Sequence, residues 1–150
     1  MKLDLGAGQF PKEGFTPIDL GSLCPGAIHY NLECGLPLDI EHDSVEEINA
    51  NNTLEHIRNL TGLMNACWDA LKRGSAMTIE VPLFPHVSAM KDPTHVRYFV
   101  PESFDYFDRD WDYPRQPDYG IKKWHVESKK VRDDGGGYVY LEVRLIKPTV

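Results

Sequence analysis

The hydrophobic positions of the chain change their period near its middle. Between residues 60 and 71 they recur at intervals of three and four residues, at Leu60, Leu63, Met64, Cys67, Trp68 and Leu71. This spacing places them on one face of an amphipathic helix. Asn59 is a suitable N-cap, and Lys72-Arg73-Gly74 is typical of a helix C-terminus. The pattern therefore predicts a helix over residues 60–71, with its Met and Trp side chains in the core.

Short apolar runs elsewhere predict strands. Four of them precede the helix, at residues 2–5, 15–18, 27–32 and 45–51, and a fifth follows it at 76–81, ending before Pro82. Two longer runs, 123–132 and 138–147, flank a turn signal of two aspartates and three glycines at 133–137. These two runs predict a hairpin. Alternating apolar residues in its second strand, from Val139 to Leu145, indicate that one face is buried.

The order of these elements predicts the α/β class, with a Rossmann-like, mostly parallel twisted sheet that ends in an antiparallel hairpin. Residues 6–14 are too short and too rich in Gly and Pro for the usual crossover helix, and no helix precedes the first strand. We therefore expect a minimal version that lacks the N-terminal helix and the first crossover helix. Residues 1–150 are expected to form a single domain. The segment 83–121, rich in Pro and aromatic residues, is the predicted lid on the acceptor side.

Composition and charge narrow the classes of function. The chain is 41% hydrophobic and 26% charged, as in ordinary soluble proteins. No apolar run approaches the roughly 20 residues of a membrane span, and the start lacks a signal pattern, so we expect a cytoplasmic protein without membrane contact. A net charge of −7 makes nucleic-acid binding an unfavoured function. The three cysteines include no C-x-x-C pair, which predicts reduced thiols rather than disulfides or a zinc ribbon.

The first predicted strand carries the clearest chemical signal. Leu3-Asp4-Leu5 leads directly into Gly6-Ala7-Gly8, and Asp19 closes the second strand. Glycines let the backbone approach a ligand without an intervening Cβ, and an acid at the end of the next strand can hold both hydroxyls of a ribose. A nicotinamide-binding site is less favoured, because the third glycine of G-x-G-x-x-G is absent and Asp19 comes before the usual ~20-residue spacing.

Further motifs follow in a consistent order. They are Gly14-Phe15-x-x-Ile18-Asp19, Asn31-Leu32-Glu33 before Leu36-Pro37-Leu38, Thr53-Leu54-Glu55-His56, Leu71-Lys72-Arg73-Gly74, and Asp92-Pro93-Thr94-His95-Val96-Arg97-Tyr98-Phe99. No single motif is decisive, but their order and spacing over most of the chain are fairly specific. Together they resemble the class I S-adenosylmethionine-dependent methyltransferases, and among these a compact subgroup with a shortened first crossover.

The resemblance implies S-adenosylmethionine as the cofactor and a set of residues that bind it. The backbone of Gly6, Ala7 and Gly8 would line the methionine part, with Asp4 near its ammonium group, and Asp19 would bind the ribose diol. Asn31 stands where the family commonly has Asp and would face the adenine amino group, with the backbone of Leu32 beside the ring. Asn51 would lie near the methionine carboxylate or the sulfonium.

The candidates for acceptor chemistry are Asp92 and His95, because their loop is expected to face the sulfur. A neutral imidazole suits a base that acts near pH 7. In the alternative interpretation, the same residues form a turn in which Asp92 is a cap and the imidazole satisfies backbone groups. Glu55-His56 either supports the cofactor pocket or opens the following helix. His86, Asp92 and His95 match no familiar metal-ligand spacing, so no metal site is predicted.

The resemblance therefore implies a methyltransferase that acts on an unassigned small-molecule or saccharide-like acceptor. The alternative is a module that binds S-adenosylmethionine or S-adenosylhomocysteine with little or no catalysis, because so short a pocket need not enclose an acceptor. DNA-base methylation is disfavoured, since no Asn/Asp-Pro-Pro-aromatic run follows the fourth strand. Loss of the first crossover helix uncovers one sheet face, and exposed apolar surface there would favour a homo-oligomer.

Overall fold

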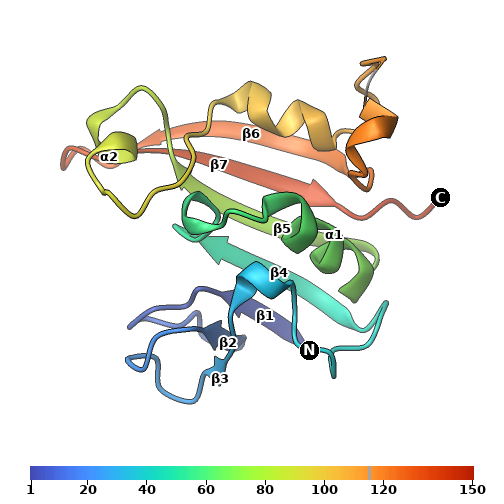
Figure 1. The fold of residues 1–150 in the computed structure, drawn as a ribbon, viewed down its shortest axis with the longest axis horizontal. Helices are drawn as coiled ribbons and strands as arrows, with labels where there is room; N and C mark the ends of the chain where they lie inside the picture. Colours follow the sequence, from blue (N-terminus) through green and yellow to red (C-terminus); the bar gives the residue numbers. More distant parts are fainter. Residues whose placement is uncertain (115) are drawn as a thin grey trace.

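The computed structural model describes residues 1–114 and 116–150, and Arg115 of the predicted lid lies outside the described residues. One sheet has the strand order β3-β2-β1-β4-β5-β7-β6 (Figure 1). The strands are β1 (Lys2–Leu5), β2 (Thr16–Asp19), β3 (Ile28–His29), β4 (Val45–Asn51), β5 (Leu71–Pro82), β6 (His125–Asp133) and β7 (Val139–Ile146). Strands β1 to β5 pair in parallel and the β6–β7 hairpin joins β5 antiparallel, which confirms the predicted fold class.

The helices are few and short. Those in the described residues are α1 (Leu60–Ala70), α2 (Val87–Met90) and the 3-10 helices η1 (Leu32–Cys34), η2 (Leu54–His56), η3 (Pro101–Phe107) and η4 (Gln116–Tyr119). None of the described helices is long and apolar enough to cross a membrane. Figure 1 shows α1, η1 and η3 on the same face of the sheet.

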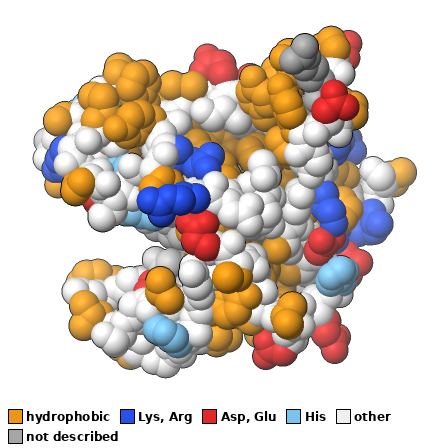
Figure 2. All heavy atoms as spheres, in the orientation of Figure 1, with side chains coloured by type: hydrophobic (Ala, Val, Ile, Leu, Met, Phe, Trp, Pro, Cys, Tyr) orange, Lys and Arg blue, Asp and Glu red, His pale blue; other side chains and the backbone are white. Residues whose placement is uncertain are grey.

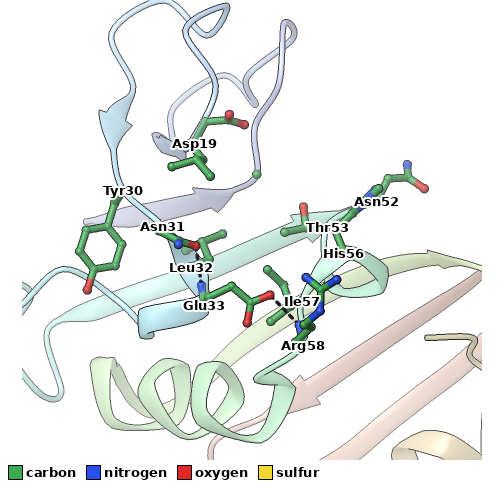
Figure 3. Close-up of a pocket in the computed structure, with 12 residues that line it drawn as sticks. Asp19, Tyr30, Asn31, Leu32, Glu33, Asn52, Thr53, His56, Ile57 and Arg58 are labelled. Atoms are coloured by element: carbon green, nitrogen blue, oxygen red, sulfur yellow. Dashed lines mark hydrogen bonds between the residues drawn. The ribbon is translucent and has the colours of Figure 1, made fainter. Parts of the chain in front are cut away.

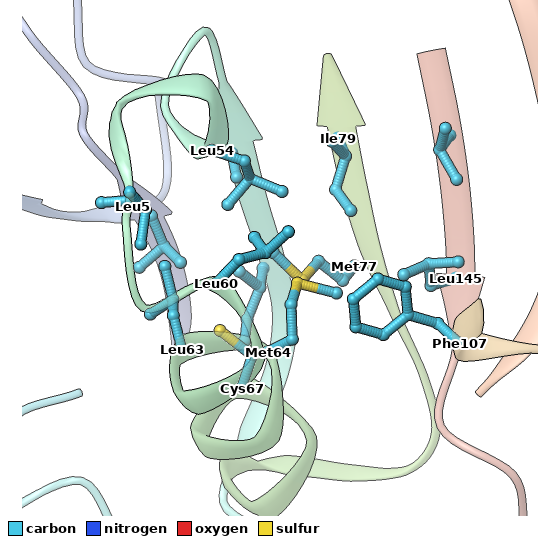
Figure 4. Close-up of a cluster of buried hydrophobic side chains, with 14 of the residues drawn as sticks. Leu5, Leu54, Leu60, Leu63, Met64, Cys67, Met77, Ile79, Phe107 and Leu145 are labelled. Carbon is cyan, nitrogen blue, oxygen red and sulfur yellow. The ribbon is translucent and has the colours of Figure 1, made fainter. Parts of the chain in front are cut away.

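The main core lies between α1 and this face of the sheet. The side chain of Asn59 accepts a hydrogen bond from the N–H of Gly62, so the predicted N-cap is confirmed. Leu63, Met64 and Cys67 of α1 are fully buried in the cluster drawn in Figure 4, together with side chains from β1, β5 and β7. Each large apolar side chain buried in this way contributes roughly 1.5–3 kcal/mol.

Two predicted boundaries are wrong. The helix ends at Ala70 rather than 71, because the fully buried Leu71 already pairs with Val45 as the first residue of β5. Gly74 is consequently no C-cap and lies inside the irregular start of β5, where its N–H donates to the carbonyl of Lys147. The third predicted strand, 27–32, is reduced to β3, because Leu32 begins η1.

The connections from β1 to β2 and from β2 to β3 contain no helix, and the structure describes every residue of both. The predicted loss of the first crossover helix is therefore confirmed, and the second connection has lost its helix as well. The strand positions that alternate with the core ones carry mostly polar side chains, including Asp4, Asn49, Thr78, Glu142 and Arg144. These strands therefore do not present the apolar surface that was expected to favour a homo-oligomer. Self-association stays a prediction.

Replacing Leu63 by Ala tests the importance of the α1–sheet core. Leu63 is fully buried, so Leu63→Ala should lower the free energy of unfolding by about 2–5 kcal/mol in urea titrations followed by circular dichroism. The matched control is Leu38→Ala, because Leu38 is fully exposed and should change stability by less than about 0.5 kcal/mol. Equal effects of the two substitutions would contradict this description of the core.

Candidate functional site

The carboxyl ends of the parallel strands meet at one edge of the sheet. Strand pairing sets Leu5 beside Ile18 and Asp4 beside Asn49, so the residues that follow β1, β2 and β4 come together there. Ligands of open α/β sheets bind in the crevice outside these ends. Figure 2 shows a groove at this edge, on the left of the molecule, between the part around α2 and the loops that follow β1, β2 and β3.

A cavity of about 480 Å³ opens in this groove (Figure 3). Its volume lies within the range of roughly 300–1,000 Å³ usual for small-molecule sites. Three segments build its wall: the ends of β1 and β2, the loop around η1, and the loop that contains η2. The lining residues are Gly6, Asp19, Leu20, Tyr30, Asn31, Leu32, Glu33, Asn52, Thr53, His56, Ile57 and Arg58.

Hydrogen bonds to one carboxylate fix the loops on the β1–β2 side. Oδ2 of Asp19 accepts from the N–H of Gly8 at 2.8 Å, and Oδ1 accepts from the N–H of Gly21 at 2.6 Å. Gly6 and Gly8 both have positive φ, 62° and 59°, which favours glycine. A carboxylate offers about four lone-pair sites, so Asp19 keeps acceptor capacity toward the cavity.

A second carboxylate joins the other two segments. Oε1 of Glu33 accepts from the N–H of Arg58 at 2.7 Å, and Oε2 accepts from the N–H of Asn59 at 2.9 Å. The hydrogen bond from Arg58 is the largest cause that holds the pKa of Glu33 below its usual range. Asn31 caps η1 by accepting from the N–H of Glu33, which orients this side chain. Glu33 therefore ties the η1 loop to the segment that precedes α1.

A smaller cavity of about 330 Å³ adjoins the first and shares Gly6 with it. Its other lining residues are Asp4, Ala7, Phe10, Lys12, Asn49 and Asn51. Asp4 is buried, and its two oxygens accept from the side-chain amide of Asn49 and from the N–H of Lys12, both at 2.7 Å. The ammonium group of Lys12 lies 3.4 Å from Oδ1 of Asn49. An anion and a cation thus stand together in this cavity.

Beside the larger cavity, four titratable side chains cluster where η2 meets the segment 92–95. Nε2 of His95 lies 3.6 Å from Oδ2 of Asp92 and 4.0 Å from Oε1 of Glu55, and Nε2 of His56 lies 3.9 Å from the same Oε1. The two imidazole rings make an edge contact with centroids 4.8 Å apart. Burial raises the pKa of Glu55 to about 7, whereas hydrogen bonds from Thr94 lower the pKa of Asp92.

No family model matches the sequence, and no curated protein matches it. Solved structures do match. An S-adenosylmethionine-dependent methyltransferase from Archaeoglobus fulgidus superposes with a TM-score of 0.69 at 15% identity, over 97% of this chain and 85% of the other. The 1,6-didemethyltoxoflavin-N1-methyltransferase of Burkholderia thailandensis was solved with bound 1,6-didemethyltoxoflavin and S-adenosylhomocysteine. It matches with a TM-score of 0.68 at 15% identity, over 98% of this chain and 70% of its own.

A third match is the 16S rRNA (adenine(1408)-N(1))-methyltransferase of Catenulisporales acidiphilia, in its W203A form. Its TM-score is 0.65 at 11% identity, over 98% of this chain and 84% of the other. The strand order of the sheet and these superpositions indicate the same fold. The chain has the class I methyltransferase fold. Because the matched enzymes are named for acceptors as different as 1,6-didemethyltoxoflavin and 16S rRNA, the fold does not select the acceptor.

Most residues predicted to bind the cofactor lie around the two cavities of this fold. Gly6, Asp19, Asn31 and Leu32 line the larger one, while Asp4, Gly6, Ala7 and Asn51 line the smaller one. Gly8 lines neither, but its N–H holds Asp19. Their roles toward a cofactor stay predictions.

The two predicted acceptor-side residues are placed differently from the expectation. Neither Asp92 nor His95 lines the larger cavity, and none of the described residues of the lid segment 83–121 does so. His56 lines it instead, and His95 lies behind His56. Sequence reasoning missed this arrangement because Glu55-His56 and His95 are far apart in the chain. It also missed Lys12, because no sequence motif marks this residue within the loop that follows β1.

Gly6 and Gly8 provide a matched pair for testing the turn after β1. A Cβ at Gly6 would overlap Thr53, lying only 2.7 Å from its Cγ2, whereas a Cβ at Gly8 would meet nothing within 4 Å. Thr53 is buried and its hydroxyl donates to the carbonyl of Leu5, so it cannot easily move away.

Both alanine variants impose a left-handed backbone on a residue with a Cβ, which costs about 1–2 kcal/mol. Gly6→Ala adds overpacking of about 1–3 kcal/mol, so its melting temperature should fall further than that of Gly8→Ala. Differential scanning calorimetry measures the difference. A Gly8→Ala variant as unstable as Gly6→Ala would contradict the role given to Thr53.

The low pKa of Glu33 predicts a pH dependence of stability. Because the folded state holds this carboxylate below its unfolded pKa, its contribution is complete above the unfolded value and is lost as pH falls through the folded one. Glu33→Gln should therefore be less stable than the parent at pH 7, and the two unfolding free energies should converge toward pH 3. The exposed Glu13→Gln serves as the control, with curves that stay parallel to those of the parent. Parallel curves for Glu33→Gln would disprove the prediction.

Proposed function

We propose that this chain binds S-adenosylmethionine across the two cavities and transfers its methyl group to a small-molecule or saccharide-like acceptor. The observation that carries the proposal is the carboxylate of Asp19, which ends β2 on the wall of the larger cavity and keeps free acceptor sites. Such a carboxylate suits a ribose diol, because it can accept from both hydroxyls.

The remaining lining fits the other parts of the cofactor. Leu32 and Ile57 give the larger cavity apolar walls suited to the adenine ring, and Asn31 adds an amide at its rim. Asp4 and Lys12 stand together in the smaller cavity, which suits the zwitterionic amino-acid end of a methionine. The two cavities share Gly6, where the absence of a side chain leaves room for a ligand that passes from one into the other.

S-adenosylmethionine, when bound, supplies an electrophilic methyl group for in-line displacement. The protein must then orient the acceptor, exclude water and handle any acceptor proton. We assign the last task to the cluster of Asp92, His95, Glu55 and His56. Within it, His56 is the member that lines the cavity, while Asp92 and His95 support it from behind.

The net charge of −7 supports a small acceptor rather than a nucleic acid, whose phosphates need cationic contacts. A second function, binding of the cofactor with little or no catalysis, is favoured by one observation. No described residue of the segment 83–121 lines the larger cavity, so the proposed lid does not enclose an acceptor there in this structure.

Ligand-dependent melting tests the cofactor. S-adenosylmethionine or S-adenosylhomocysteine at 100 times its dissociation constant should stabilise the chain by about 2.7 kcal/mol, whereas NAD should leave the melting temperature unchanged. Methyl transfer from a radiolabelled donor to a panel of phenols, amines and sugars then separates catalysis from binding alone. A chain that melts at the same temperature with and without both adenosyl compounds is not a cofactor-binding protein.

The variant Asp19→Asn sharpens this test. Loss of the charge should weaken S-adenosylhomocysteine binding about tenfold to hundredfold in calorimetric titrations, since hydrogen bonds to charged groups contribute roughly 1.5–3 kcal/mol. The control is Asp39→Asn, at an exposed position outside both cavities, which should bind like the parent. Unchanged affinity in Asp19→Asn would remove the observation on which the proposed function rests.

A further inference from the structure

Three side chains with metal-binding atoms converge beside the larger cavity. Glu55 and His56 are consecutive residues of η2, and His95 comes from the segment after α2. One carboxylate oxygen and one ring nitrogen from each imidazole all lie within 4.8 Å of one another. Asp92 adds a fourth group, because its Oδ2 lies 3.6 Å from Nε2 of His95.

The hydrogen bonds around both imidazoles leave the same nitrogen free. Nδ1 of His95 lies 2.7 Å from the carbonyl oxygen of Ala89, so in the neutral ring it must carry the proton and donate. Nδ1 of His56 faces the carbonyl and the hydroxyl of Thr94, and that hydroxyl donates to Asp92. Both Nε2 atoms therefore turn a lone pair toward Glu55. Metal-binding histidines are typically held in this way by a carbonyl or carboxylate on the other nitrogen.

One oxygen of the Glu55 carboxylate lacks the partner that a buried polar atom requires. Only 2% of the residue is exposed, and Oε2 has no hydrogen-bond partner among the described parts of the chain. Its Oε1 is 3.9–4.0 Å from the two Nε2 atoms, too far for hydrogen bonds. An unpaired polar atom in the interior is costly, and a cation between these groups would compensate it.

We propose that Glu55, His56 and His95 bind a divalent transition-metal ion, with Asp92 beside His95 as a supporting group. Two imidazoles and a carboxylate favour Zn²⁺, Mn²⁺, Fe²⁺ or Co²⁺ over Ca²⁺ and Mg²⁺, which prefer oxygen ligands. Metal–ligand bonds of about 2.0–2.2 Å would require the ligand atoms to close by a few tenths of an ångström to about half an ångström. The side chain of His56 is 38% exposed and has room for this adjustment.

The location suggests what the ion does. His56 lines the larger cavity, so a coordination position on its side faces the groove in which we place the cofactor. An ion there would bind an oxygen atom of the acceptor and lower the pKa of an acceptor hydroxyl. The cluster would then handle the acceptor proton through the bound ion rather than through a free imidazole. This role rests on the proposed function, whereas metal binding itself does not.

A second group of potential ligands provides the control. The ligand atoms of Asp108, Asp110 and His125 also lie within 4.8 Å of one another, but the side chains of Asp110 and His125 are 70% and 45% exposed and neither carboxylate is buried. His125→Gln removes an imidazole of the same kind outside the proposed site. His56→Gln and His95→Gln remove the imidazole nitrogens that the proposed site uses as ligands.

The test is a titration of the chelator-treated full chain with Co²⁺, followed by its visible absorption, and with Zn²⁺, followed by calorimetry. One ion should bind per chain. His95→Gln and His56→Gln should each weaken binding by about a hundredfold or more, given that loss of a mere supporting group costs about 10–100-fold. His125→Gln should bind like the parent. Circular dichroism melting identifies any histidine variant that fails to fold. Asp92→Asn is then used in its place, and its metal affinity should be lower by about tenfold or more.

Two results overturn the site: no ion bound at a micromolar-to-millimolar concentration, or binding that survives in both histidine variants. Melting of the chelator-treated chain with S-adenosylhomocysteine is measured in parallel. Metal binding without a response to S-adenosylhomocysteine would overturn the proposed function and support the metal site. A response to S-adenosylhomocysteine without metal binding would support the function and overturn the site.

Discussion

The parallel pairing of β1 with β2 and β4 is the constraint on which the site depends. It brings the residues after three strands to one edge, although the connections between β1, β2 and β3 contain no helix in the described chain. Hydrogen bonds to carboxylates hold these loops in place of the absent helix. Asp4 holds the N–H of Lys12, and Asp19 holds the N–H groups of Gly8 and Gly21. These acids fix the loops and line the cavities at the same time.

Carboxylates also hold the loops on the other side of the groove. Glu33 connects the η1 loop to the start of α1, and the cluster around Glu55 connects η2 to the segment 92–95. In a chain whose described helices are few and short, loops are held by buried or partly buried acids rather than by layers of helices. Such acids are expensive to bury unless they are hydrogen-bonded or paired with a cation, so each of them is also a candidate for chemistry.

Sequence periodicity predicted the fold wherever local pattern and tertiary packing agree. The helix beginning at Leu60 and the strand Val45–Asn51 fall where the apolar spacing predicts them. Leu71 shows where the apolar periodicity fails. It continues the helical spacing, but in the structure it is the fully buried first residue of β5. The loss of the first crossover helix was visible as a connection too short and too rich in Gly and Pro, whereas the missing second helix and the polar character of the opposite sheet face emerged only from the structure.

For the site, the glycines and Asp19 were predictable because their chemistry is tied to the ends of neighbouring strands. The cluster of Glu55, His56 and His95 was not, because His56 and His95 are 39 positions apart in the sequence and only the fold brings their rings together. Likewise, no sequence motif indicates that the N–H of Lys12 donates to Asp4 and so holds Lys12 at the smaller cavity.

The central claim is that an adenosyl cofactor occupies the edge of the sheet where β1, β2 and β4 end. A crystal structure of the chain with S-adenosylhomocysteine tests it most directly. The account predicts the ribose hydroxyls on the carboxylate of Asp19, the adenine against Leu32 and Ile57, and the amino-acid end beside Lys12. Electron density for the ligand at any other place, or none at saturating concentration, would contradict it.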